Sequence, residues 1–192
     1  MSTALSTPNR IVWDYFLSLR LLEENARKAP SLELSRQAAA LAVVMAVTVV
    51  EVFLNLWFRV HVEERKIPSE REALLKDLST RISLDRKLKQ WPQRYLSDVL
   101  NLTAGVGDEF MKLKGLRNSI VHFTTSHESI DLGNVMIHGL ADTTEYDALS
   151  AEKASWALQT AEDLVAELFR LAGISSEEIP HALHSWVGKV PV

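Results

Sequence analysis

The stretch Ala38–Phe58, AAALAVVMAVTVVEVFLNLWF, decides the fold of this chain. It belongs to a longer run between Pro30 and Pro68 that contains no glycine or proline, and Ser31 is well placed to cap the start of that run. At a rise of 1.5 Å per residue, a helix over the whole run would be about 50 Å long. The sequence therefore predicts one long helix that forms the spine of the domain.

The same stretch is apolar enough to raise the alternative of a membrane span, because about 20 apolar residues suffice to cross a bilayer. Glu51 and Asn55 lie well inside the stretch, one helical turn apart on the same face. A bilayer strongly disfavours a carboxylate, whereas a protein interior can pair it with Arg59 or with an arginine from another helix. We therefore expect a buried core helix and no membrane partner.

Helical spacing of apolar residues continues on both sides of this stretch. We predict further helices from Thr7-Pro8 to about Pro30, from Pro68 onwards with a capping box at Ser69–Glu72, and over 84–103 in one or two pieces broken near Pro92. Another helix is expected to start at a cap at Asp108, and the last to run from about Ser150 to Gly173. The residues of the Asp108 helix that are expected to pack are Phe110, Leu113, Leu116, Ile120 and Phe123. Trp91 and Tyr95 lie among basic residues, where they could stack on bases, but we favour a place in the core.

Alternating apolar residues around Gly133-Asn134 predict a small β-hairpin or extended excursion near 129–138 that covers the helices. The predicted fold class is thus all-α, an up-and-down helical bundle with one long spine helix. We expect a single domain over 1–192, with a core at about 8–173 and a short C-terminal appendage at 174–192. Trp186 in that appendage is expected to dock on the domain or on a partner.

Charge is unevenly distributed along the chain, although the formal net charge is only −4. Residues 1–80 hold 10 basic and 10 acidic side chains, residues 81–117 hold 8 against 4, and residues 126–192 hold 3 against 11. An acidic protein is a poor general coat for nucleic acid, yet the basic stretch 81–117 could guide a polyanion locally. The alternative is that these cations are simply solvated helix faces.

The chain has no cysteine, and its start, MSTALSTPNR, has no apolar signal core. Disulfides, thiolate metal sites and cysteine nucleophiles are therefore excluded, and a cytoplasmic location is expected. The seven glycines do not form a phosphate-binding loop or a nucleophile elbow. His181 and His184 are three residues apart but lack companions for a metal site, so we expect ordinary surface histidines and no metal or cofactor.

The hexapeptide Arg117-Asn118-Ser119-Ile120-Val121-His122 is the strongest functional signal. Arginine holds phosphate oxygens through a planar fork of donors, and an imidazole exchanges protons near neutral pH. On a regular helix Asn118 and His122 share a face, whereas Arg117 is turned by about 140° from His122. One helix therefore cannot close a site by itself, and the least elaborate second surface is the same helix of another copy across a two-fold axis.

The motif LRNSIVHF, Leu116–Phe123, on a late helix resembles the signature of the HEPN superfamily of helical ribonucleases. An earlier long helix with an acidic residue, here Glu51–Asn55, is also similar to that superfamily. The resemblance implies an all-helical homodimer that cleaves RNA without a metal, as a toxin or phage-defence effector with an antitoxin or sensor protein as a possible partner. It implies that Arg117 stabilises charge on the phosphate, Asn118 orients a reacting group and His122 acts as acid or base. Glu51 and Asn55 would support the arginine from behind.

One departure limits the resemblance. Some HEPN toxins carry a modified tyrosine two residues after the histidine, where this chain has Thr124, so regulation by that route is in doubt. Three alternatives remain open: a catalytically inactive module that binds a nucleotide, RNA or protein, a scaffold dimer without a ligand, and a motif that merely complements the carboxyl end of a helix dipole.

Overall fold

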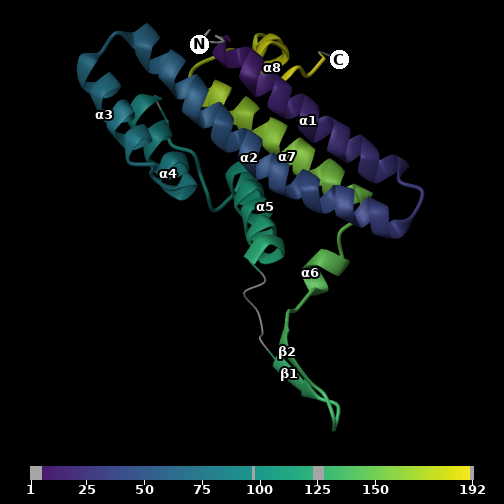
Figure 1. Ribbon diagram of the computed structural model, residues 1–192. Coiled ribbons are helices and arrows are strands. Elements are labelled where there is room, and N and C mark those ends of the chain that lie inside the picture. The colour runs from purple at the N-terminus through teal and green to yellow at the C-terminus, as the bar shows by residue number, and fades with distance from the viewer. Residues whose placement is uncertain (1–5, 97, 123–127, 191–192) are drawn as a thin grey trace, which may run out of the picture.

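The predicted spine helix is α2, which runs from Leu32 to Arg65 in the computed structural model (Figure 1). The structure describes residues 6–96, 98–122 and 128–190. The hydroxyl of Ser31 accepts a hydrogen bond from the Leu34 amide at 3.3 Å, and Lys66 ends the helix in the left-handed conformation. The start of the long helix is therefore as predicted, and its end lies within two residues of the predicted end.

Helices α1 and α7 pack along α2, and α8 completes the bundle (Figure 1). Helix α1, Pro8–Lys28, runs antiparallel to α2, and α7, Ala151–Leu171, lies behind both. Helix α8, Ile179–Val187, packs on α1 and α7. Trp186 of α8 meets Phe53 of α2 edge-on at 5.9 Å between ring centroids, so the C-terminal tryptophan docks on the domain itself. Within the described residues the fold is the predicted all-α bundle with one small hairpin.

Helix α2 has the length and apolar composition of a membrane span, and half of its most apolar window is buried in the bundle. The buried residues include Phe53, whose ring meets Phe169 of α7, and Phe58, whose ring meets Trp91 and Tyr95 of α4; both phenylalanines are fully buried. Core helices of soluble proteins share these properties. The expectation that α2 does not cross a membrane stays a prediction.

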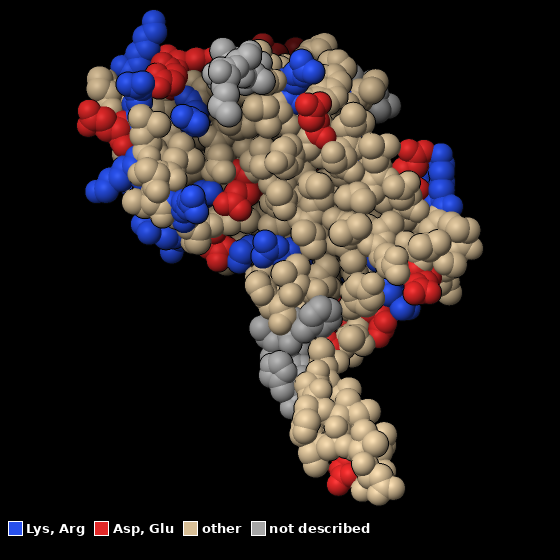
Figure 2. Space-filling model, viewed as in Figure 1, with Lys and Arg blue, Asp and Glu red and all other residues tan. Residues whose placement is uncertain are grey.

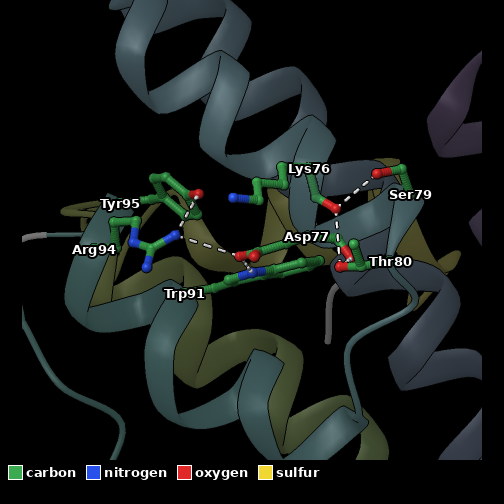
Figure 3. A network of polar contacts seen from close by, with 7 residues as sticks. All are labelled: Lys76, Asp77, Ser79, Thr80, Trp91, Arg94 and Tyr95. Carbon is green, nitrogen blue, oxygen red and sulfur yellow. Dashed lines mark hydrogen bonds and ion pairs between the residues drawn. The ribbon is translucent and has the colours of Figure 1, made fainter.

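Helices α3, Pro68–Ser79, and α4, Leu84–Tyr95, form a second layer beside the carboxyl half of α2 (Figure 1). They are joined through Asp77 of α3, whose Oδ2 accepts hydrogen bonds from Trp91 Nε1 at 3.0 Å and from Arg94 Nη1 at 3.3 Å (Figure 3). Trp91 and Tyr95 are completely buried. Their predicted place in the core is confirmed, and neither ring is available to stack on a base.

Two predicted boundaries in this layer are wrong. Helix α3 begins at Pro68 after Ile67 and has no side-chain cap, because a proline already has the backbone angle of a first helical turn, so Ser69–Glu72 lies inside the helix. Helix α4 is a single piece that contains Pro92 and ends three residues later at Tyr95, so the predicted helical region does not extend to residue 103. The burial of the neighbouring aromatic rings outweighs the one hydrogen bond that proline removes so close to the helix end.

Helix α5, Gly105–His122, begins three residues earlier than the predicted cap, so Asp108 lies in its first turn. The segment before it passes very close to the helix. A Cβ atom on Gly107 would lie 2.1 Å from the backbone oxygen of Asn101. Glycine at this position thus lets the connection from α4 lie against α5 and sets where the motif helix starts.

Strands β1, Glu128–Asp131, and β2, Met136–Leu140, form the predicted antiparallel hairpin, with Ile130 opposite Ile137. The turn at Gly133-Asn134 is confirmed by the bond from the Leu132 amide to the Val135 oxygen at 3.0 Å. The hairpin does not cover the helices but projects away from them (Figure 1), and a short helix α6, Thr144–Asp147, leads back to α7. The prediction of a covering excursion was therefore wrong, because the two strands pair with each other and almost all of their described side chains are exposed.

Replacing Gly107 by alanine is expected to destabilise the protein by about 1–3 kcal/mol, because the added methyl group meets rigid backbone. The matched control is Gly115→Ala in the same helix, where a Cβ atom meets nothing within 4 Å. That change should stabilise the protein by about 1 kcal/mol through helix propensity. Urea denaturation followed by circular dichroism measures both, and equal effects of the two changes would contradict the close approach at Gly107.

Candidate functional site

The second half of α5 carries the motif, and two of its residues are in direct contact. Arg117 Nη1 donates a hydrogen bond to Asn118 Oδ1 at 3.0 Å, and both side chains are half-buried. The Nε atom of Arg117 is buried and has no hydrogen-bond partner among the described residues. The amide thus holds the guanidinium in place and leaves one of its donors unused.

His122 is the last residue of α5 and is exposed. Among the described residues, no hydrogen bond or ion pair joins it to Arg117 or Asn118. An exposed imidazole at the carboxyl end of a helix is accessible to a ligand. The arginine of the same helix points in another direction and does not contact this histidine. Phe123 and Thr124, which the sequence analysis considered for packing and for regulation, lie outside the described residues.

Glu51 has a different partner from those predicted. Its Oε1 atom lies 2.5 Å from Nζ of Lys87 on α4, so the carboxylate pairs with a lysine and not with Arg59 or another arginine. The lysine is buried, with 4% of its surface exposed, whereas the Glu51 side chain is 42% exposed. The expectation of a buried glutamate that needs a partner was thus reversed: the buried charge is the lysine, and Glu51 neutralises it from the surface.

Sequence reasoning missed Lys87, although a signal was present. Lys87 lies one turn from Leu84 and one turn from Trp91 on α4, and all three are buried on the same helix face. A lysine on an apolar helix face needs an anion, and Glu51 was the unexplained anion on α2. The buried lysine on α4 and the glutamate on α2 therefore account for each other.

Asn55, one turn after Glu51 on α2, has its Oδ1 atom buried without a hydrogen-bond partner among the described residues. No hydrogen bond connects Asn55 or Glu51 to Arg117 in the described part of the chain. Support of the arginine by these two residues therefore stays a prediction that would require a rearrangement or a bridging group.

The cations nearest the motif on α5 are already paired. Lys112 lies 2.9 Å from Asp108 and 2.7 Å from Glu109, and Lys114 lies 2.9 Å from Asp85 of α4. The hydrogen bonds from Lys112 and from Trp156 hold the pKa of Glu109 below its usual range. These lysines contribute little net positive charge to the site.

Half of the basic stretch is neutralised in this way, since Lys87, Arg94, Lys112 and Lys114 each pair with a carboxylate. Arg81, Arg86 and Lys89 are exposed, and no carboxylate of the described residues lies within ion-pair distance of them. Figure 2 shows the basic side chains gathered mainly at the α3–α4 end, whereas the hairpin shows an acidic group and no basic one. Ion pairs thus account for half of the cations of the stretch, and both interpretations, a path for a polyanion and a solvated helix face, stay predictions for Arg81, Arg86 and Lys89.

Other clusters of titratable groups are weaker candidates. His181 and His184 lie exposed on α8, where His184 packs edge-on against Trp13 at 5.4 Å. Among the described residues there is no group of three or more histidine, aspartate and glutamate side chains that could hold a metal ion. A cavity of about 600 Å³ between α2 and α3, lined by Arg59 and Arg71, contains no motif residue.

Comparison of the chain with models of protein families, with curated proteins and with solved structures finds no match. The resemblance to HEPN ribonucleases therefore rests on Arg117, Asn118 and His122 and on the helical setting of these residues. Any function has to be argued from the chemistry of the site.

The pair formed by Glu51 and Lys87 gives a prediction for stability. Glu51→Gln leaves a buried ammonium group without an anion and is expected to cost on the order of 2 kcal/mol, less than for a fully buried pair because Glu51 is half-exposed. Adding Lys87→Met removes the buried charge and should restore most of that loss. Urea denaturation of both variants measures the effect, and a double variant no more stable than Glu51→Gln would contradict this account.

Proposed function

We propose that this protein is a metal-independent endoribonuclease of HEPN type whose site is shared between two copies of the chain. One observation carries the proposal: a half-buried arginine fixed by an adjacent amide lies on the same helix as an exposed terminal histidine. A fixed cation that stabilises charge and an accessible imidazole that transfers protons are the kinds of group that phosphodiester cleavage without a metal uses.

The chemistry can be written with these side chains alone. The ribose 2′-hydroxyl loses its proton to one imidazole and its oxygen attacks phosphorus, while the 5′-oxygen leaves and takes a proton from a second imidazole. The products are a 2′,3′-cyclic phosphate and a 5′-hydroxyl. Arg117 stabilises the extra negative charge on the phosphate, and Asn118 keeps the guanidinium oriented through the 3.0 Å hydrogen bond.

The reaction needs two imidazoles and an arginine that faces them, and one α5 helix offers a single histidine with its arginine turned about 140° away. A second α5 across a two-fold axis supplies both missing groups. His122 of one copy then acts as base and the other as acid, with an Arg117 from each side. This composite arrangement is the part of the proposal that depends on a homodimer.

The charge distribution suggests the direction from which RNA reaches the site. Arg86 and Lys89 lie on α4 and Arg81 lies just before it, and Asp85 at the start of α4 contacts Lys114 of α5. The chain has no lysine or arginine between Arg117 and Lys153 but has six acidic residues there. RNA therefore approaches along α4, and the hairpin side repels it.

The proposed biological role follows from the resemblance alone. A cytoplasmic toxin or phage-defence effector would be held inactive by an antitoxin or a sensor protein. The acidic hairpin and its exposed apolar residues offer such a partner a surface distinct from the RNA path.

The catalytic assignment is tested by incubating the purified protein with RNA in the presence of a chelator. Both Arg117→Ala and His122→Ala are expected to lower the cleavage rate by about 10²–10⁴-fold, because each removes a group that acts in the transition state. Products of the wild-type reaction should carry 2′,3′-cyclic phosphate ends.

Matched controls are Arg10→Ala and His181→Ala, which remove an exposed arginine and an exposed histidine far from α5 in the sequence. They should cleave at the wild-type rate. Equal rates for all variants, or an absence of cleavage by the wild type, would rule out the catalytic role of the motif.

A second candidate function is a binding module that holds RNA or a nucleotide without cleaving it. The hydrogen bond between Arg117 and Asn118 favours it, because a guanidinium already fixed by a neighbour is suited to static anion recognition. RNA binding that needs Arg117 but not His122, with no product formed, would support this alternative.

A further inference from the structure

A cavity of about 520 Å³ lies beside the motif helix, between α5, α6 and α7. Gly115 and Ser119 of α5 line it, together with Glu145 of α6 and Trp156 of α7. Ser119 belongs to the hexapeptide Arg117–His122, so the motif itself forms part of the cavity wall. The volume is that of a small-molecule site, for which roughly 300–1,000 Å³ is usual.

The histidine of the motif lies on the same face of α5 as this cavity. Gly115, Ser119 and His122 follow one another at spacings of four and three residues, so on a regular helix they share one face. Lys114, which contacts α4, and Glu109, which contacts α7, are turned from Gly115 by roughly 100° and roughly 120° in opposite directions. His122 therefore points between the α4 side of the motif helix and the cavity side.

Trp156 is the aromatic wall of the cavity, and it differs from the other tryptophans. Part of it packs on the core, and its Nε1 donates a hydrogen bond to Oε2 of Glu109 at 3.3 Å, which fixes the indole ring. Over the ring lies the ammonium group of the exposed Lys153, 4.9 Å from the centroid. No ring of the described residues packs against Trp156, whereas another ring packs against each of the other four: Trp13, Trp57, Trp91 and Trp186. A planar group that displaces the lysine can therefore stack on the indole.

The charges around the cavity balance. Its two acidic residues are Glu109 and Glu145, and its two basic residues are Lys112 and Lys153. Lys112 and Glu109 pair with each other at 2.7 Å, and neither Glu145 nor Lys153 has an ion-pair partner among the described residues. A phosphate group gains little in such a neutral site. An uncharged planar group with hydrogen-bonding edges meets an aromatic face, a free acceptor and a free donor, and a nucleobase has these properties.

Gly115 leaves the cavity open on the α5 side. The residue is exposed within a helix, where glycine is disfavoured, and a Cβ atom there would meet nothing within 4 Å. Packing inside the chain therefore does not require glycine here, in contrast to Gly107. Close approach of a ligand to the helix backbone gives this glycine a use.

We propose that the cavity binds one nucleobase of the RNA, from a nucleotide next to the bond on which His122 acts. The base stacks on Trp156, and its edge meets Glu145 and Lys153. The sugar–phosphate backbone passes over Gly115 to reach His122. Phosphates thus follow the α4 side, whereas the uncharged base enters the side on which the chain is acidic. The identity of the ligand as RNA rests on the proposed function, and the choice of a base rests on the cavity.

Filling the cavity tests this inference without disturbing the core. Gly115→Leu is expected to weaken binding of a short single-stranded RNA of mixed sequence by about 5–100-fold, the usual effect of losing one stacked base. Fluorescence anisotropy of labelled RNA measures binding, with His122→Ala as the common parent so that the RNA stays uncut. The control Gln37→Leu, at an exposed residue of α2 that does not line the cavity, should bind as the parent does.

Two further comparisons identify the base and the ring. Trp156→Ala should weaken binding as Gly115→Leu does, whereas Trp156→Phe, which keeps an aromatic face, should retain most of it. An RNA with abasic sites in place of its bases should bind the parent and Gly115→Leu equally. A parent that binds no RNA, a Gly115→Leu variant that binds mixed RNA as tightly as the parent, or an equal loss with abasic RNA would overturn the proposal.

Cleavage assays with His122 intact separate this inference from the proposed function. RNA that binds through Gly115 and Trp156 but is never cut overturns the nuclease and leaves the base site intact. RNA that Gly115→Leu cuts with the KM of the wild type overturns the base site and leaves the nuclease intact.

Discussion

The need to cover the apolar surface of α2 is the constraint on which the rest of the structure depends. A helix of 34 residues with a nearly continuous apolar middle cannot remain in water alone. Helices α1 and α7 bury one side of it, and the aromatic side chains Phe53, Trp57 and Phe169 interlock there with ring centroids 5.4–5.6 Å apart. The remaining elements pack on the outside of this core.

The second layer shows how polar groups are accommodated around that core. Lys87 reaches Glu51 across the gap between α4 and α2, and Asp77 joins α3 to α4 through Trp91. Each of these pairs places one partner in the interior and one at its edge, where water lowers the cost of the charge. Gly107 lets the preceding segment lie against the amino end of α5, Ile120 is buried near the other end, and only the last two residues, Val121 and His122, are exposed there.

Most helices could be predicted from the sequence because their apolar repeats are long and their prolines lie at their starts. The errors have physical causes that a single sequence does not display. Pro92 remained inside α4 because Trp91 and Tyr95 are anchored in the core, and the hairpin at Gly133-Asn134 was recognised but not its projection away from the helices. For the site, the contact of Arg117 with Asn118 follows from adjacency, whereas the Lys87 partner of Glu51 depends on how two helices cross.

The unused Nε donor of Arg117 has a thermodynamic meaning of its own. Among the described residues this buried donor has no acceptor, and such a donor typically makes a fold less stable by about 1–3 kcal/mol than an apolar group in the same place. The arginine marks a place where the free protein gives up stability that an acceptor oxygen from outside the chain can restore.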